Sequence, residues 1–262
     1  MHRRGYLFWG FVLIVLAGLL LLRQMGLIVG DIFGYFWPLL IIAFGAWLII
    51  GFFSRSQPGG GEKISIPLAG STGAYLRLEH GAGRLSLRPG AMPAEILNGT
   101  FGNGLSYTSQ LQGGQLELKL RPSRQYWVWW PGENLDWDIF LNQDIPLKLK
   151  IESGASASVL DLRDLKVIDL DIDTGASSTD LILPANAGNT HVEIDTGASS
   201  VKVAVPQGVA ASIRVKSGIA SVNVNSRFTN LGGGLYQSSD YGTSANRVDM
   251  IINSGVGSIE VN

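Results

Sequence analysis

The chain of 262 residues contains no cysteine. That absence excludes a disulfide-stapled fold, a thiolate metal site and a cysteine nucleophile. An excess of positive charge is also missing, because 20 Lys and Arg stand against 21 Asp and Glu, for a formal net charge of −1. Without a basic surplus to grip phosphates, we expect no binding to nucleic acid.

Long apolar runs are present only near the start of the chain. Residues 5–22 and residues 32–53 carry no charge, and about 20 apolar residues are enough for a helix to cross a bilayer. We therefore predict a transmembrane α-helical hairpin over residues 1–56. A secretory signal peptide is the alternative for the first run, because Arg3 and Arg4 precede it.

The basic residues around these runs predict the orientation. His2, Arg3 and Arg4 precede the first run, and Arg55 and Lys63 follow the second, whereas the connecting loop holds one arginine and one aspartate. The positive-inside rule then predicts a multi-pass protein of the cell membrane, with both termini in the cytoplasm.

After the second run the composition changes, and a repeat appears. A Pro- and Gly-rich linker at residues 57–63 separates the membrane region from a β-repeat domain at 64–262, whose clearest repeats lie at 145–262. The repeat reads apolar, polar, Ser or Thr, Gly, two small residues, then alternating apolar and polar residues. Its glycines are Gly154, Gly175, Gly197, Gly218 and Gly255, and a fainter copy begins at Leu78.

The alternation with period two on both sides of each glycine predicts strand, turn and strand. Leu170 and Ile172 alternate with aspartates, and Ile168 is expected on their face. We expect the glycine to supply the positive φ of a tight hairpin turn, and successive hairpins to stack into an all-β, solenoid-like domain. Residues 226–246 break the period and are predicted to form a polar surface loop. The last strand, ending near Val261, is expected at the sheet edge.

Two copies of Asp-Thr-Gly, at Asp173 and Asp195, resemble the paired loops of aspartic proteases, where two carboxylates share a proton. A spacing of 22 residues leaves no room for a second lobe. The same position in other repeats holds Glu152, Lys216 and Asn253, so we interpret it as facing solvent. We predict that the protein is not an enzyme and has no catalytic residue.

Acidic residues gather around these turns. Asp169, Asp171 and Asp173, with Asp180 and Asp195, contain oxygen ligands that Ca²⁺ prefers. The spacing of a calcium loop is missing, and we favour a solvated acidic sheet face without a metal.

Other candidate sites lack the pattern that their chemistry needs. His80 and His191 lie in strand-like contexts without a nucleophile elbow. The Gly-rich stretches 99–104 and 232–234 lack a nucleotide-binding fingerprint. We predict no cofactor.

The segment from Gln125 to Phe140 holds four tryptophans: Trp127, Trp129, Trp130 and Trp137. They are able to form a patch for a partner or a membrane interface. We favour the alternative, in which they flank a turn at Pro131 and Gly132 and cap the open end of the apolar core.

Two stretches resemble known families. FWPLLIIAFGAWLI at 36–49 and WGFVLIVLAGLLLL at 9–22 look like the two-helix membrane region of LiaI/LiaF-like envelope proteins. IPLKLKIESGAS at 145–156, DLRDL at 161–165 and the two TGAS turns resemble the toastrack, or LiaF-type, C-terminal β-repeat domain.

The resemblance implies a bacterial, non-enzymatic membrane protein that acts as an accessory regulator or scaffold in cell-envelope stress signalling. Its expected partners are the lipid bilayer and a membrane histidine kinase or another envelope protein, reached through the β-repeat domain. The alternatives are a self-assembling structural or adhesion module, with a homo-oligomer as its product, and, remotely, an aspartic peptidase.

Overall fold

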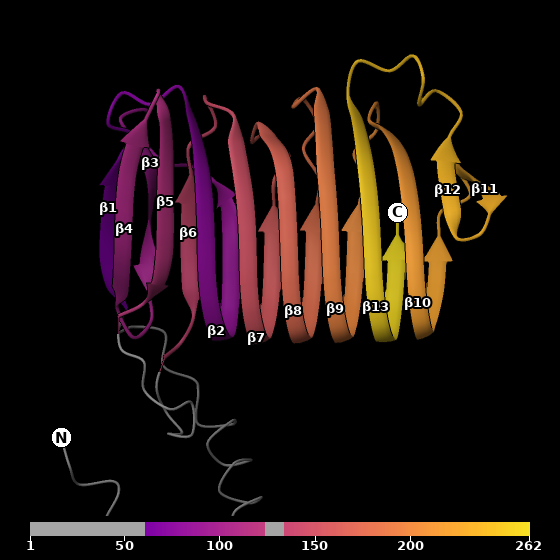
Figure 1. Cartoon of the computed structure of the whole chain (residues 1–262), viewed down its shortest axis with the longest axis horizontal. Helices are drawn as coiled ribbons and strands as arrows, with labels where there is room; N and C mark the ends of the chain where they lie inside the picture. The colour runs from indigo at the N-terminus through magenta and orange to yellow at the C-terminus, as the bar shows by residue number, and fades with distance from the viewer. Residues whose placement is uncertain (1–60, 124–133) are drawn as a thin grey trace, which may run out of the picture. The chain divides into compact units, whose positions relative to one another are not determined.

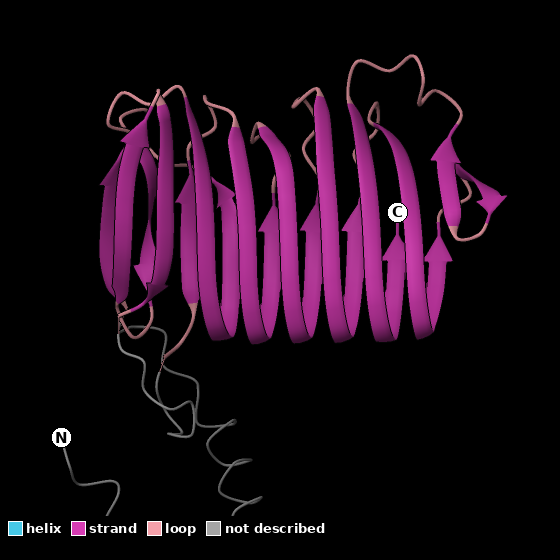
Figure 2. Ribbon diagram, viewed as in Figure 1, coloured by secondary structure: helices cyan, strands magenta, loops and turns pink. Residues whose placement is uncertain are grey.

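The computed structural model of the protein describes residues 61–123 and 134–262. The predicted membrane region, and Trp127, Trp129 and Trp130, lie outside these residues. Within the described part the regular structure is entirely strand (Figure 2). A search of that part for a helix long and apolar enough to span a membrane finds none.

The described residues form thirteen strands. They are β1 (Glu62–Pro67), β2 (Gly73–Pro89), β3 (Glu95–Phe101), β4 (Leu105–Gln112), β5 (Gln115–Pro122), β6 (Trp137–Leu141), β7 (Leu147–Asp161), β8 (Val167–Ile182), β9 (Asn189–Ala204), β10 (Ala210–Val224), β11 (Phe228–Gly232), β12 (Leu235–Ser238) and β13 (Arg247–Val261).

Six of these strands are long and bend sharply in the middle, so that each makes an arch with two arms (Figure 1). We call each such strand a coil, the part before the bend its first arm and the part after it its second arm. The coils lie in the order β2, β7, β8, β9, β13, β10 and pair in parallel. The predicted repeats are thus confirmed as stacked coils, and the faint copy at Leu78 is the first of them.

The predicted hairpin pairing is wrong. In an antiparallel hairpin the two arms would hydrogen-bond to each other, but here every arm pairs with the equivalent arm of the next coil, as Asp173 pairs with Asp195. The arms of one coil meet only through their side chains. Each ladder therefore runs across the stack, as in a solenoid.

The reason for the corner glycines differs from the expected one. None of the repeat glycines has a positive φ. Instead, a Cβ added at Gly175 would lie 2.8 Å from the carbonyl oxygen of Gly154, and one added at Gly197 would lie 2.7 Å from that of Gly175. The same contact recurs at Gly255 and Gly218. Glycine is needed because the backbones of successive corners touch.

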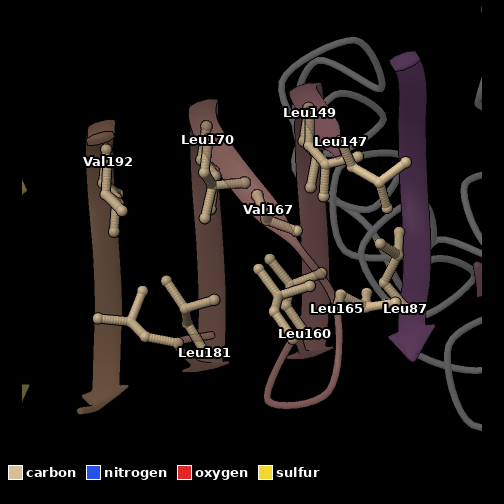
Figure 3. Close-up of a cluster of buried hydrophobic side chains, with 14 of the residues drawn as sticks. Leu87, Leu147, Leu149, Leu160, Leu165, Val167, Leu170, Leu181 and Val192 are labelled. Carbon is tan, nitrogen blue, oxygen red and sulfur yellow. The ribbon is translucent and has the colours of Figure 1, made fainter. Parts of the chain in front are cut away.

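The core lies between the two arms of the coils. Alternate residues point inward and form rows across the stack, such as Leu149, Leu170 and Val192 in the first arms (Figure 3). Ile168 departs from the expected alternation: it is half-buried, and Val167 is fully buried instead. A register shift at the start of β8 explains this, because one extra residue moves the inward position.

At its N-terminal end the stack continues in both arms. The second arm of β2 pairs with β6, which pairs with β3 and then β1. The first arm of β2 pairs with β5, which pairs with β4. Trp137 of β6 is buried here, edge-on to Phe101 at 5.3 Å. Of the four tryptophans it is the one within the described residues, and it closes this end of the core.

Two expectations about the C-terminal part are wrong. The last strand, β13, is not at the edge: it is inserted between β9 and β10 and pairs with both along its length (Figure 1). Residues 226–246 are not only a surface loop, because they contain the β11–β12 hairpin, whose β12 pairs with residues Ser212 to Arg214 of β10. The outermost coil is therefore β10.

Candidate functional site

Because the coils are in register, equivalent outward residues form columns across the first arms. The column beside the corner reads Glu79, Glu152, Asp173, Asp195, Asn253 and Lys216. The next column reads Arg77, Lys150, Asp171, Glu193, Ile251 and Arg214, and the third reads Tyr75, Lys148, Asp169, His191, Asp249 and Ser212. We call this surface the first-arm face.

The first-arm face is neutralised over its N-terminal coils. The guanidinium of Arg77 donates two hydrogen bonds of 2.9 Å to the carboxylate of Glu152, and Lys119 contacts Glu79 at 2.6 Å. Lys150 donates to Asp171. The pKa of Arg77 is raised mainly by its hydrogen bond to Glu152, and that of Lys150 by its hydrogen bond to Asp171. Arg77, Lys119 and Lys150 are therefore already paired with acidic residues of their own chain.

Over β8 and β9 the same face carries unpaired acids. Within the described part of the chain, Asp169, Asp173 and Glu193 form no ion pair and no side-chain hydrogen bond. Asp173 is exposed, and the other two are half-buried. The sheet thus holds three carboxylates that have no partner among the described residues. We call Asp169, Asp173 and Glu193 the acidic patch.

Asp173 and Asp195, the residues of the two Asp-Thr-Gly turns, are register partners in neighbouring coils. They line an open depression of about 470 Å³ at the corner, with Lys216 and Asn253. Asp195 accepts a hydrogen bond of 2.6 Å from the side-chain amide of Asn253, and no hydrogen bond in the described part joins the two carboxyls. An aspartic protease dyad, in contrast, shares one proton between its carboxyls.

The threonines of these turns have a structural role that the sequence analysis missed. Thr174 hydrogen-bonds to Ser177 at 2.8 Å, and Thr196 to Ser199 at 2.7 Å, across the inside of the corner. In β13 the residue three positions after Ser254 is Gly257, and the buried hydroxyl of Ser254 has no hydrogen-bond partner among the described residues. The sequence signal that could have predicted these hydrogen bonds is a serine three residues after the Ser or Thr that precedes the corner glycine.

The five aspartates weighed as calcium ligands do not gather. Asp169, Asp171 and Asp173 alternate along the first arm of β8, whereas Asp180 lies on its second arm beyond the bend. Across residues 61–123 and 134–262 no group of three acidic or histidine side chains is placed to hold a metal ion. Four of the five, Asp169, Asp171, Asp173 and Asp195, lie on the first-arm face described above.

The two histidines in the described residues lie apart. His191 is exposed in the first-arm face, between Asp169 and Asp249. His80 is buried at the first corner, where later coils have Ser or Thr, and its Nε2 lies 2.9 Å from the carbonyl oxygen of Leu135. Burial lowers the pKa of His80.

The Gly-rich stretches have structural causes. A Cβ at Gly99 would lie 2.4 Å from the carbonyl oxygen of Asp138, so the stretch 99–104 permits close packing of β3 against β6. Gly232, Gly233 and Gly234 all have positive φ and make the turn of the β11–β12 hairpin. In the first stretch Gly104 also has a positive φ of 74°, a left-handed backbone that glycine adopts readily.

Comparison with known proteins matches both regions of the chain. The model for the N-terminal domain of toast_rack, DUF2154, matches residues 55–204, and the model for the LiaI-LiaF-like transmembrane region matches residues 7–49. The two resemblances found in the sequence are confirmed. Neither family description names a catalytic activity.

Among solved structures, the chain is similar to a "putative cell adhesion protein" from Clostridium sporogenes ATCC 15579. The TM-score is 0.70 at 24% sequence identity, over 77% of this chain and 98% of that one. This likeness shows a shared fold. No curated protein matches the chain.

Proposed function

Because the chain belongs to the toast_rack family, which its match over residues 55–204 shows, we propose that it is a non-enzymatic membrane protein of the bacterial envelope. Its β domain regulates or scaffolds envelope-stress signalling by contact with another protein. The observation that carries this proposal is the acidic patch, in which the paired strands β8 and β9 hold three carboxylates without partners in the described chain. A surface of this kind suits a partner with a basic face.

The membrane location rests on the LiaI-LiaF-like match at residues 7–49. We propose two transmembrane helices and a cytoplasmic β domain. The chain has no cysteine of its own, so Ser239→Cys, at an exposed position before β13, gives a single label site. We expect a membrane-impermeant thiol reagent to label it only after the cells are opened. Labelling of intact cells would place the domain outside.

The proposed partner is a membrane histidine kinase. Its contact is tested by purifying the full chain from native membranes with Asp169→Asn, Asp173→Asn and Glu193→Gln combined. We expect the variant to lose most of the co-purified kinase and to change the output of the signalling pathway, because the patch would no longer attract a basic surface. The control is Asp180→Asn, which removes a carboxylate from the second arm. Equal kinase recovery from both variants would contradict the proposal.

A structural or adhesion role is the second candidate, supported by the description of the similar Clostridium sporogenes protein as a "putative cell adhesion protein". It requires the β domain to face outward, so the Ser239→Cys experiment separates the two roles. The remote peptidase alternative predicts a peptidase activity that Asp173→Asn with Asp195→Asn abolishes. We expect no such activity, because Asp195 is hydrogen-bonded to an amide rather than to Asp173.

A further inference from the structure

The outermost coil, β10, has one paired edge and one edge that is largely free. On its inner side β10 pairs with β13 from Ala210 to Val224. On its outer side β12 pairs only with Ser212 to Arg214, and the amide of Val215 donates to Gly234. From Lys216 to Val224 no strand of the described chain pairs with this outer side.

The apolar core is open along the same edge. Val222 and Val224 occupy inward rows in which their neighbours Ile259 and Val261 are 1% and 0% exposed. Both valines of β10 are only half-buried, although they pack against the core. Ile219, at the bend, is 79% exposed. One more strand along this edge would bury the same rows that the interior coils bury.

Lys216, at the start of the free edge, is its one charged residue, and beyond it the devices that normally protect a sheet edge are missing. Protected edges carry lysines, prolines, bulges or a covering segment. Residues 217–224, SGIASVNV, contain no charge and no proline, and the register with β13 shows no shift. This edge therefore favours addition of a strand.

The sequence of the second arm fits another copy of itself. We propose that the free edge of β10 pairs antiparallel with the same edge of a second copy of this chain, about a twofold axis near Val222. The bend limits straight pairing to the second arm, and Val222 is the middle of its last five residues. This inference goes beyond the proposed function and shares with it only the membrane location.

In that pairing, side chains of similar polarity lie opposite each other on both faces of the new strand pair. The outward Ser221 of one copy lies opposite Asn223 of the other, so polar side chains meet and no like charges oppose each other. On the inward side Val222 faces its equivalent, and Ala220 faces Val224. The inward rows of the two second arms then continue into each other, and anchoring in one membrane raises the effective concentration of the two edges.

Disulfide trapping tests the pairing in the full-length chain in its membrane. Copies with Ser221→Cys and copies with Asn223→Cys are expressed together and mildly oxidised. We expect a cross-linked dimer, because directly opposite residues have Cβ atoms about 4.5–5.5 Å apart. The control pair, Ser178→Cys with Ser200→Cys, lies on the outward side of interior second arms. Absence of cross-linking at the edge, or equal cross-linking in the control, would overturn the proposal.

Charge reversal provides the second measurement. Ser221→Lys with Asn223→Lys places lysines opposite each other twice, and we expect the purified full chain to become monomeric. Ser221→Glu with Asn223→Glu does the same with opposite sign, and a mixture of the two variants is expected to recover the dimer. Both positions are exposed, so the fold should persist. A dimer that survives the lysine variant, or a wild-type chain that is monomeric in membranes, would overturn the proposal.

Discussion

The two ends of the coil stack are finished in different ways. At the N-terminal end both arms of β2 continue into further strands, and the core is closed by Trp137, Phe101 and His80. At the C-terminal end the β11–β12 hairpin covers part of the first arm of β10, and the second arm has no neighbour in the described chain. The difference teaches that a repeat stack needs a cap at each end, and that this chain caps one end more completely than the other.

The largest loss of stability is expected from removing a buried side chain at the N-terminal end of the stack. Trp137→Ala removes a fully buried ring and should lower the free energy of unfolding by about 3–5 kcal/mol. Val222→Ala at the other end should cost less than about 1 kcal/mol, because that side chain is only half-buried. Denaturant unfolding of the full chain in detergent measures both. Similar costs at the two sites would remove the distinction between the ends.

A smaller effect is expected where coils touch in the middle of the stack. Gly197→Ala would place a Cβ 2.7 Å from the carbonyl oxygen of Gly175 and should cost about 1–3 kcal/mol through forced displacement of the backbone. Gly81→Ala is the matched control, since the first corner has no atom within 4 Å of the new Cβ. If both variants unfold at the same denaturant concentration, backbone contact is not the reason for glycine.

The corner hydroxyls allow a finer comparison. Thr196→Val removes the hydrogen bond to Ser199 and should cost about 1 kcal/mol. Ser254→Ala, one coil nearer the C-terminal end, removes a buried hydroxyl without a partner and should be neutral or stabilising. Thermal unfolding of the two variants beside the wild type gives the comparison. A larger loss in Ser254→Ala would show that the second hydroxyl does form a bond.

The most limited effect is a pH dependence confined to the N-terminal corner. Burial lowers the pKa of His80 below the ordinary value of 6.5, so the unfolded chain binds a proton at a pH where the folded chain does not. Stability should therefore fall as the pH drops below about 6.5 and should level off below the folded-state pKa. His80→Gln should remove this part of the pH dependence, with His191→Gln as the control. An unchanged pH profile in His80→Gln would contradict it.

The local part of the fold was predictable, because the repeat carries its own signal. The alternation of Val201 and Val203 with Lys202, and the acidic outward row of β8, appear in the structure as expected. The reason for the corner glycines was not predictable, since a bend that pairs with its neighbour and a hairpin that pairs with itself require the same local pattern. Only the contact between Gly175 and Gly197 distinguishes them.

The candidate site was predictable only as a set of residues. The sequence placed Asp169 and Asp173 on an outward face, but their lack of ion-pair partners depends on where Lys150 and Arg77 fall in the neighbouring coils. The hydrogen bond from Asn253 to Asp195 joins residues 58 apart. No local pattern reports such a pairing, because it follows from the order of the coils.

The sequence by itself determined that the chain makes stacked strand–corner–strand repeats, and which residues of most repeats face inward, because both follow from a period of two around a small corner. The tertiary structure decided the order of the coils. Strand β13 has larger inward residues than β10, as Met250 and Ile252 beside Ile213 and Val215 illustrate. Burying the more apolar strand on both sides removes more apolar surface from water, and the last strand therefore lies inside the stack while β10 forms its free edge.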